Sequence, residues 1–307
     1  MLLNLRYLRK CKYYLNKEGT LVVKKLSEQE LEKRWQQATI KRDVIFTKTF
    51  GDNKALTLEL LNIILPELKI KEIIDIVPED RQKENIVYRG VRFDVYAKDE
   101  KGRGYDIEMQ VVNHHDLGKR IAFYQNKLSS RALNPGQYFF EKRDTYVIFV
   151  CDFDYFNQGL PIYRTTMRLE EDLNKVVDTG EYNVILNSRA KDFSSVSPEV
   201  KAFLDYIRDS KVSNEFTKNV DEEVRKVKAN TETRDSFMDW EEKLAEERYY
   251  TDKEAREEER SSNISGVIQE LNDDGMSKEQ IIRIVSNSFK ITKEEAQEYY
   301  DKELAVK

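Results

Sequence analysis

The sequence predicts an α/β fold in which helices are followed by a three-stranded antiparallel meander, another helix and a buried strand. Three observations support this prediction. The spacing of apolar residues changes at Pro66 from the 3.6-residue period of helices to the two-residue period of strands. Alternating segments bounded by turn residues follow Pro66, as in antiparallel hairpins. A run of six apolar residues at 146–151 then has the composition of a strand that is buried on both faces.

The composition argues against a membrane or secreted protein. Of the 307 residues, 39% are hydrophobic and 36% are charged. No apolar run approaches the roughly 18 residues that a membrane span needs. Arg6 and Arg9 interrupt the apolar residues of the N-terminus, which therefore lacks the core of a signal peptide. Cys11 and Cys151 are too far apart for a disulfide framework or a zinc knuckle, so we expect a reduced, cytoplasmic protein.

The charge changes sign along the chain, although the net charge is only −5. Residues 1–42 contain 11 Lys and Arg against 4 Asp and Glu, whereas residues 221–307 contain 15 against 24. A basic front half would suit a partner that carries phosphates, although solvated arms explain each end taken alone. The shifts in composition predict four regions: a basic extension at 1–30, an α/β domain at 31–210, a charged helical tail at 211–262 and a small helical hairpin at 263–307.

Apolar residues with the spacing of a helix occur before the predicted sheet and again between its strands. One helix is expected over residues 31–51, and a second over 54–65 ends at Pro66. A third is expected over 116–133, after the meander. The strands are expected at 69–79, 85–99 and 104–112 for the meander, at 145–153 for the buried strand, and near 182–187.

The C-terminal third is predicted to be helical. Residues 197–209 are expected to form a helix that begins with a serine cap and a proline in the first turn. The polar stretch 215–260 has few apolar positions and is predicted to be one extended helix, which is a candidate for homodimer contacts. Capping-box patterns beginning at Ser277 and Thr292 predict a terminal helical hairpin.

Acidic residues gather on the two neighbouring strands that end the meander. Because side chains alternate between the faces of a strand, Asp94 shares the polar face of this hairpin with Asp106, Glu108 and Gln110. Clustered carboxylates raise one another's pKa, and a bound divalent cation would remove this cost. Carboxylate oxygens are the ligands that Mg²⁺ prefers. The same alternation also fits an ordinary hairpin whose polar face meets water.

This pattern resembles the core of the PD-(D/E)XK nucleases. The segment RFDVYAKDEKGRGYDIEMQ at 92–110 is similar to the central signature of the Rpn family of recombination-promoting nucleases and transposases, in which Glu-x-Gln often replaces Glu-x-Lys. The helices at 43–70 and the segment GKRIAFYQNKL at 118–128 also resemble parts of that family. The similar segments follow in order over about residues 30–305.

The resemblance implies roles for individual residues. Asp94 and Glu108 would be metal ligands, and Gln110 occupies the position of the lysine that orients the attacking water in the wider superfamily. Glutamine can hydrogen-bond a water but supplies no cation. Arg120 or Lys119, at the start of the following helix, is therefore expected to add the positive charge.

Two further features belong to this interpretation. Arg120 and Tyr124 lie one helical turn apart, so they can contact the same phosphate of a substrate. Asp43 corresponds to the acid of the first helix of the nuclease core, although it would also suit an ion pair within its own helix.

The resemblance implies a metal-dependent DNA endonuclease that hydrolyses phosphodiester bonds and is linked to recombination or mobile elements. Mg²⁺ would be the usual ion, with Mn²⁺ as a second. The alternative is an inactive nuclease fold that serves as a DNA-binding or oligomeric assembly module. The missing lysine and the acidic tail favour this alternative, whereas the intact Asp94 and Glu108 favour the enzyme. A coiled-coil adaptor would explain residues 215–260 but not the hairpin.

Overall fold

The computed structural model describes residues 13–15, 21–23, 27–78, 94–133 and 136–304. The chain forms two compact units, one of residues 29–238 and the other of residues 1–28 and 239–307. Among the described residues, no helix is both long and apolar enough to cross a membrane.

A six-stranded mixed sheet forms the centre of the larger unit, with the strand order β3-β4-β5-β6-β8-β7. Strands β3, β4 and β5 form the predicted antiparallel meander. Strand β6 then pairs in parallel with β5, and β8 in parallel with β6. The strands are β3 (Ile73–Pro78), β4 (Val95–Asp99), β5 (Gly104–Gln110), β6 (Thr145–Cys151), β7 (Ile162–Thr165) and β8 (Glu181–Asn187).

This arrangement confirms the predicted α/β class and the order of its core elements. Every residue of β6 is buried, as its apolar composition indicated. The predicted strand near 182–187 is β8. The edge strand β7, antiparallel to β8, was not predicted. Residues 85–93 of the predicted second strand lie outside the described part of the chain.

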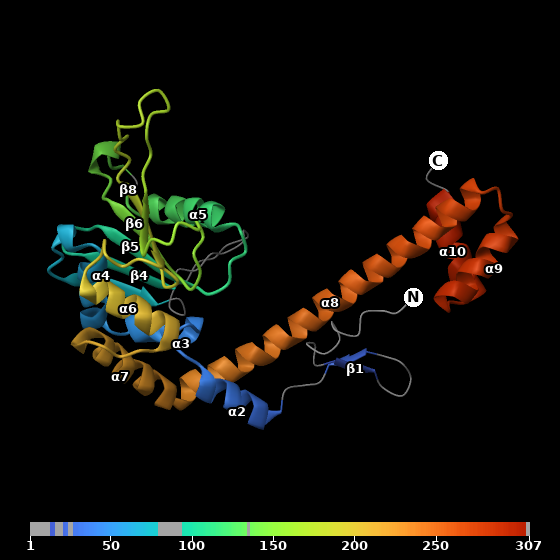
Figure 1. Ribbon diagram of the computed structural model, residues 1–307, viewed down its shortest axis with the longest axis horizontal. Coiled ribbons are helices and arrows are strands. Elements are labelled where there is room, and N and C mark those ends of the chain that lie inside the picture. The colour runs from blue at the N-terminus through green and yellow to red at the C-terminus, as the bar shows by residue number, and fades with distance from the viewer. Residues whose placement is uncertain (1–12, 16–20, 24–26, 79–93, 134–135, 305–307) are drawn as a thin grey trace. The chain divides into compact units, whose positions relative to one another are not determined.

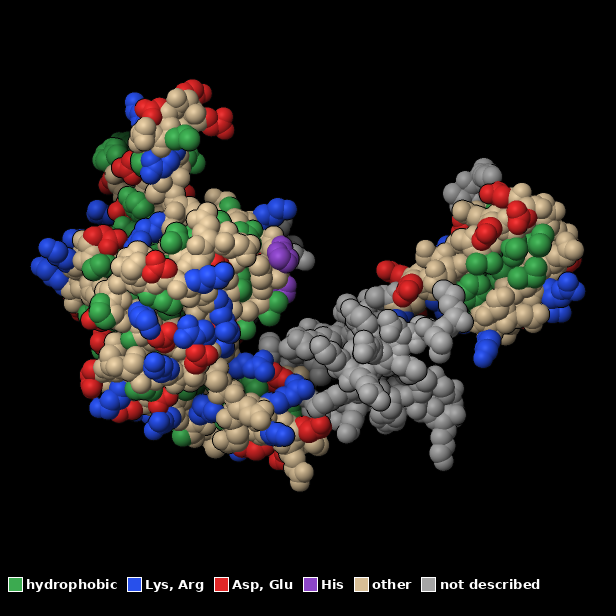
Figure 2. Space-filling model, viewed as in Figure 1, with side chains coloured by type: hydrophobic (Ala, Val, Ile, Leu, Met, Phe, Trp, Pro, Cys, Tyr) green, Lys and Arg blue, Asp and Glu red, His purple; other side chains and the backbone are tan. Residues whose placement is uncertain are grey.

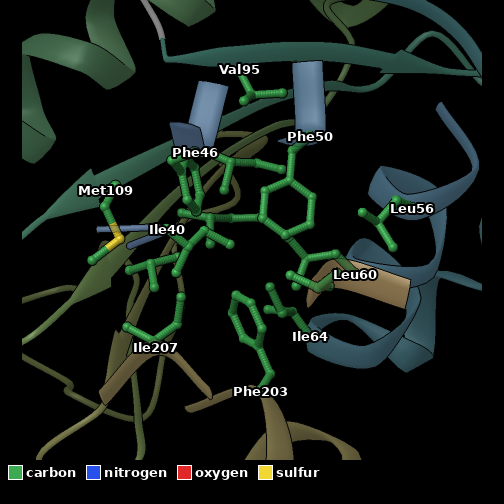
Figure 3. Packing of buried hydrophobic residues seen from close by; sticks show 14 of the residues in the cluster. Ile40, Phe46, Phe50, Leu56, Leu60, Ile64, Val95, Met109, Phe203 and Ile207 are labelled. Atoms are coloured by element: carbon green, nitrogen blue, oxygen red, sulfur yellow. The ribbon is translucent and has the colours of Figure 1, made fainter. Parts of the chain in front are cut away.

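Helices cover both faces of the sheet (Figure 1). On one face a large apolar core joins the sheet to six helices, and on the other a smaller core joins it to α5. In the large core, Phe46 and Phe50 of α3, Leu60 of α4 and Phe203 of α6 pack together near Val95 of β4 (Figure 3). The helices of this unit include α2 (Glu28–Gln37), α3 (Asp43–Gly51), α4 (Lys54–Ile64), α5 (Leu117–Ser130), α6 (Pro198–Asp209) and α7 (Glu215–Ala229).

The prediction of a single helix over residues 31–51 is wrong, because the chain forms α2 and α3 with a break between them. The Lys228 ammonium donates to the backbone oxygens of Gln36 and Ala38 and so satisfies the end of α2. Ile40 is fully buried at the break, and Lys41 Nζ lies 2.7 Å from the Asp152 carboxylate. These contacts with distant parts of the chain outweigh the local helical pattern.

The extended helix predicted over 215–260 is also two helices. Helix α7 carries buried apolar residues at Phe216, Val220, Val224 and Val227 and packs into the large core. Helix α8 (Thr231–Asp273) begins after Asn230, which ends α7 in an extended conformation.

The smaller unit contains short elements at both ends of the chain. Residues Tyr13–Leu15 (β1) and Leu21–Val23 (β2) pair as an antiparallel hairpin. The predicted terminal hairpin is formed by α9 (Lys278–Phe289) and α10 (Lys293–Leu304). Both predicted capping boxes form, as the reciprocal hydrogen bonds of Ser277 with Gln280 and of Thr292 with Glu295 show.

The turn between β4 and β5 is closed by the buried carboxylate of Asp99. It accepts hydrogen bonds from the backbone N–H groups of Lys101 and Arg103, from Arg103 Nε at 2.6 Å and from the Tyr105 hydroxyl at 2.8 Å. Asp99 is fully buried and Arg103 nearly so. This network holds the two strands of the hairpin in register at their turn.

We expect Asp99→Ala to lower the free energy of unfolding of the larger unit by about 3–5 kcal/mol, because the buried Arg103 guanidinium would lose its partner. Urea unfolding followed by tryptophan fluorescence checks this, since Trp35 is buried in the same unit. Asp209→Ala is the matched control. Its carboxylate is exposed and pairs with Arg208, so a loss below about 1 kcal/mol is expected. Equal losses in the two variants would contradict the role of the Asp99 network.

Candidate active site

Asp94, which directly precedes β4, lies beside Glu108 of β5, and the carboxylate of each residue accepts a backbone hydrogen bond. The Asp94 backbone N–H donates to Glu108 Oε1 at 2.9 Å, and the Met109 backbone N–H donates to Asp94 Oδ2 at 2.9 Å. These two bonds follow from the register of the hairpin, in which Val95 of β4 is opposite Ile107 of β5. The structure therefore brings the two predicted acids together and fixes both carboxylates by backbone donors.

The polar face of β5 is buried beneath α5. Asp106 is 0% exposed and Glu108 only 3%. Burial raises the pKa of both carboxyl groups well above their usual range. The neighbouring Asp106 raises the pKa of Glu108 further, while the Asp94 backbone N–H and the Tyr124 hydroxyl act in the opposite direction by hydrogen bonding. The expectation of an ordinary hairpin whose polar face meets water is thus wrong for β5.

Helix α5 brings Arg120 and Tyr124 to the same place. Tyr124 is buried, and burial followed by the charge of Glu108 raises the pKa of its hydroxyl. Arg120 lies over the Tyr124 ring, 5.6 Å from its centroid, and its Nη2 donates to the Tyr124 hydroxyl at 3.3 Å. Lys119 is exposed, so Arg120 is the basic residue of this pair that faces the acids.

Asp43, the first residue of α3, joins this group from another layer of the fold. Burial raises the pKa of its carboxyl, while the nearby Arg42 and Arg120 guanidinium groups lower it. Because Arg120 acts on both Asp43 and Tyr124, the predicted acid of the first helix and the predicted residues of α5 converge on one region.

The side chain of Gln110, unlike those of the other predicted site residues, hydrogen-bonds the nearby backbone. Its Nε2 donates to the backbone oxygen of Val112 at 2.8 Å, and the side chain is largely buried. The amide oxygen of Gln110 remains the group with which it could accept a hydrogen bond from a water.

Asp106 was noted in the sequence but not counted among the candidate residues. Both of its carboxylate oxygens are buried, and the neighbouring Glu108 carboxyl group forms a side-chain hydrogen bond with Asp106. The signal for Asp106 is its spacing, since residues two apart on a strand share a face and Asp106 precedes Glu108 by two. What the sequence could not indicate is that α5 would exclude water from this face.

The donors of this region suit a hard divalent cation. In the part of the chain that the structure describes, no three His, Cys, Asp or Glu side chains converge as a ready metal-binding group. Two carboxylates, Asp94 and Glu108, face each other across the hairpin, and Mg²⁺ is commonly held by one or two carboxylates with waters. The buried carboxyl group of Asp106 next to Glu108 adds a third acid, whose ionised form a bound cation would stabilise.

Comparison with known proteins agrees with this geometry. The model of the PD-(D/E)XK nuclease family transposases matches residues 40–256, a stretch that contains every residue of the candidate site. No curated protein and no solved structure matches the chain. The family match covers more than half of the sequence, and the six-stranded mixed sheet flanked by helices is consistent with a PD-(D/E)XK core. The chain therefore belongs to the PD-(D/E)XK nuclease family transposases.

Proposed function

We propose that this protein is a metal-dependent DNA endonuclease that hydrolyses phosphodiester bonds. The observation that carries the proposal is that two backbone N–H groups, of Asp94 and of Met109, fix the carboxylates of Glu108 and Asp94 next to each other. Family membership implies a nuclease associated with mobile elements and DNA as its substrate.

Asp94 and Glu108 hold the divalent ion in this proposal. PD-(D/E)XK nucleases typically use divalent metals, and we propose Mg²⁺, with Mn²⁺ as an ion that can replace it. Such an ion lowers the pKa of a water and offsets the charge that develops on the leaving oxygen. The backbone donors to both carboxylates limit their rotation, so the ligands are oriented before the ion binds.

Arg120 and Tyr124 bind and orient the substrate phosphate. The stacking of Arg120 on the Tyr124 ring and the hydrogen bond between them hold the guanidinium in one position. A fixed guanidinium is a strong donor to phosphate oxygens and supplies the positive charge that Gln110 lacks. Tyr124 also hydrogen-bonds Glu108, so it links the phosphate-binding group to the metal ligand. Asp43 positions Arg120 through its charge.

Gln110 supports the alternative, an inactive nuclease fold that binds DNA or assembles with other proteins. Its amide N–H is occupied by Val112, and it provides no cation next to the acids. In the enzyme, its free oxygen would instead accept a hydrogen bond from the attacking water. A homodimer through the charged helix α8 remains a prediction from its sequence.

We expect Asp94→Asn and Glu108→Gln each to lower the rate of plasmid cleavage by about 100-fold or more, because each variant keeps the shape of the side chain but loses the charge that holds the ion. Purified protein is assayed with Mg²⁺, with Mn²⁺ and with EDTA. Glu59→Gln, an exposed residue of α4 on the other side of the sheet, is the matched control and should cleave normally.

Cleavage that persists in both variants would place the chemistry outside this hairpin. No cleavage by the folded wild-type protein would instead favour the inactive nuclease fold.

We also expect Mn²⁺ or Mg²⁺ to stabilise the wild-type protein against thermal unfolding and EDTA to reverse the effect. The gain follows mass action and reaches about 2.7 kcal/mol when the ion is present at 100 times its Kd. In Asp94→Asn the gain should largely disappear. Differential scanning calorimetry over a range of ion concentrations measures this, and an equal shift in wild type and variant would argue against Asp94 as a ligand.

A further inference from the structure

Three consecutive aromatic side chains project from the surface between α5 and β6. Tyr138 is 70% exposed, Phe139 89% and Phe140 84%. Hydrophobic side chains gather on the surface around this short segment (Figure 2). Single exposed apolar residues are common on proteins, but contiguous large ones mark interaction sites.

A hydrogen-bonded turn presents these aromatic rings. Residues Phe139–Glu141 form the short helix η3, and the Tyr138 backbone N–H donates to Glu141 Oε2 at 2.7 Å. The rings of Tyr138 and Phe140 stack with 5.4 Å between their centroids. Lys142 fixes the end of the turn through its ion pair with Glu181 at 2.7 Å. The exposed rings are therefore held by local hydrogen bonds and an ion pair.

A basic pocket of about 350 Å³ lies directly beside the aromatic segment. Gln137 and Glu141, which flank the three aromatic residues, line this pocket, so the rings lie at its edge. Four basic side chains, Lys98, Lys101, Arg131 and Arg143, line it against two acidic ones, Glu100 and Glu141, so its lining carries a net positive charge. Among the described residues, no carboxylate forms an ion pair with Lys98, Lys101 or Arg143. These charges are thus available to an anionic partner.

The pocket lies on the same face of the hairpin as the candidate active site. Asp94 directly precedes β4 and Lys98 lies within it four residues later, so at about 3.3 Å per residue the two are separated by about 13 Å along the chain. Helix α5 follows the same course, with Tyr124 near Glu108 and with Leu128 and Arg131 at the pocket. In B-DNA, phosphates of one strand follow at about 3.4 Å along the axis, so both places can contact one strand a few nucleotides apart.

We propose that Tyr138, Phe139 and Phe140, with the basic pocket beside them, bind a single-stranded segment of DNA that flanks the cleavage position. The basic side chains would neutralise its phosphates, and the exposed rings would stack on unpaired bases, whose faces are accessible only outside a duplex. This proposal rests on the proposed nuclease function and names its preferred substrate as DNA with a single-stranded flank.

Binding of three fluorescein-labelled DNAs to the full-length protein tests the proposal by anisotropy in EDTA, so that no cleavage occurs. The DNAs are a 20-nucleotide single strand, a blunt 20-base-pair duplex and the same duplex with a single-stranded tail. We expect the Phe139→Ala, Phe140→Ala double variant to bind the single strand and the tailed duplex about 10-fold more weakly or worse, because base stacking is lost. Its affinity for the blunt duplex should change little.

Two further double variants separate ring stacking from general apolar contact. Phe139→Tyr with Phe140→Tyr keeps both rings and should bind as the wild type does. Phe139→Leu with Phe140→Leu keeps apolar side chains without rings and should behave like the alanine variant. Because both positions are highly exposed, folding is expected to be unaffected, and circular dichroism checks this.

The charged part is tested by Lys101→Gln with Arg143→Gln. Removing two phosphate contacts should weaken binding to all three DNAs and make the slope of log Kd against log salt shallower by about 1.4 for the single strand. An unchanged slope would show that the pocket does not contact the phosphates of the bound DNA.

Two results would contradict the proposal that the three aromatic side chains bind single-stranded DNA. One is an equal loss, or no loss, of affinity for all three DNAs in the alanine variant. The other is a lower molecular mass of the alanine variant in light scattering, which would make this surface an interface between copies of the chain. The binding assay contains no metal and is therefore independent of the cleavage assay. Loss of selective binding would contradict this proposal without contradicting the nuclease function. Loss of cleavage would contradict the nuclease function even if selective binding is observed.

Discussion

The candidate site depends on the register of one antiparallel hairpin. With Val95 opposite Ile107, the Asp94 and Glu108 carboxylates each accept a backbone N–H from the neighbouring strand. A slip of one residue would turn Glu108 into the large apolar core and Ile107 onto the polar face. The buried Asp99 network at the turn and the parallel pairing of β5 with β6 oppose such a slip. Stability of the fold and orientation of the acids therefore have the same physical origin.

Burial sets the acid–base properties of the carboxyl groups on this hairpin. An acidic strand face that met water would carry ordinary carboxylates, whereas burial beneath α5 raises the pKa of Asp106 and Glu108. Buried negative charge is unfavourable unless a cation or a proton balances it. The larger unit tolerates this cost because its apolar core on the opposite face of the sheet is extensive.

Helix α5 connects the candidate active site to the proposed DNA-binding surface. Its beginning carries Arg120 and Tyr124 against the acids, and its end contributes to the basic pocket next to the exposed aromatic rings. Because a helix is rigid over this length, the separation of the two surfaces is set by the fold. A DNA strand that contacts both would be held at defined positions relative to Asp94 and Glu108.

Elements with local causes could be predicted from the order of residues alone. The alternation along the meander, the apolar run of β6 and the capping boxes of α9 and α10 all involve residues close in sequence, and they formed as predicted. The pairing of Asp94 with Glu108 was also predictable, because a short turn joins the segments that carry them.

The break between α2 and α3 was not predictable in this way, because it depends on the contact of Lys41 with Asp152 and on Lys228. The same holds for the cover of the acids by α5, the approach of Asp43 to Arg120, and the basic pocket beside Tyr138, Phe139 and Phe140. These features join residues tens of positions apart, and no local pattern of spacing or propensity encodes which distant side chains will meet.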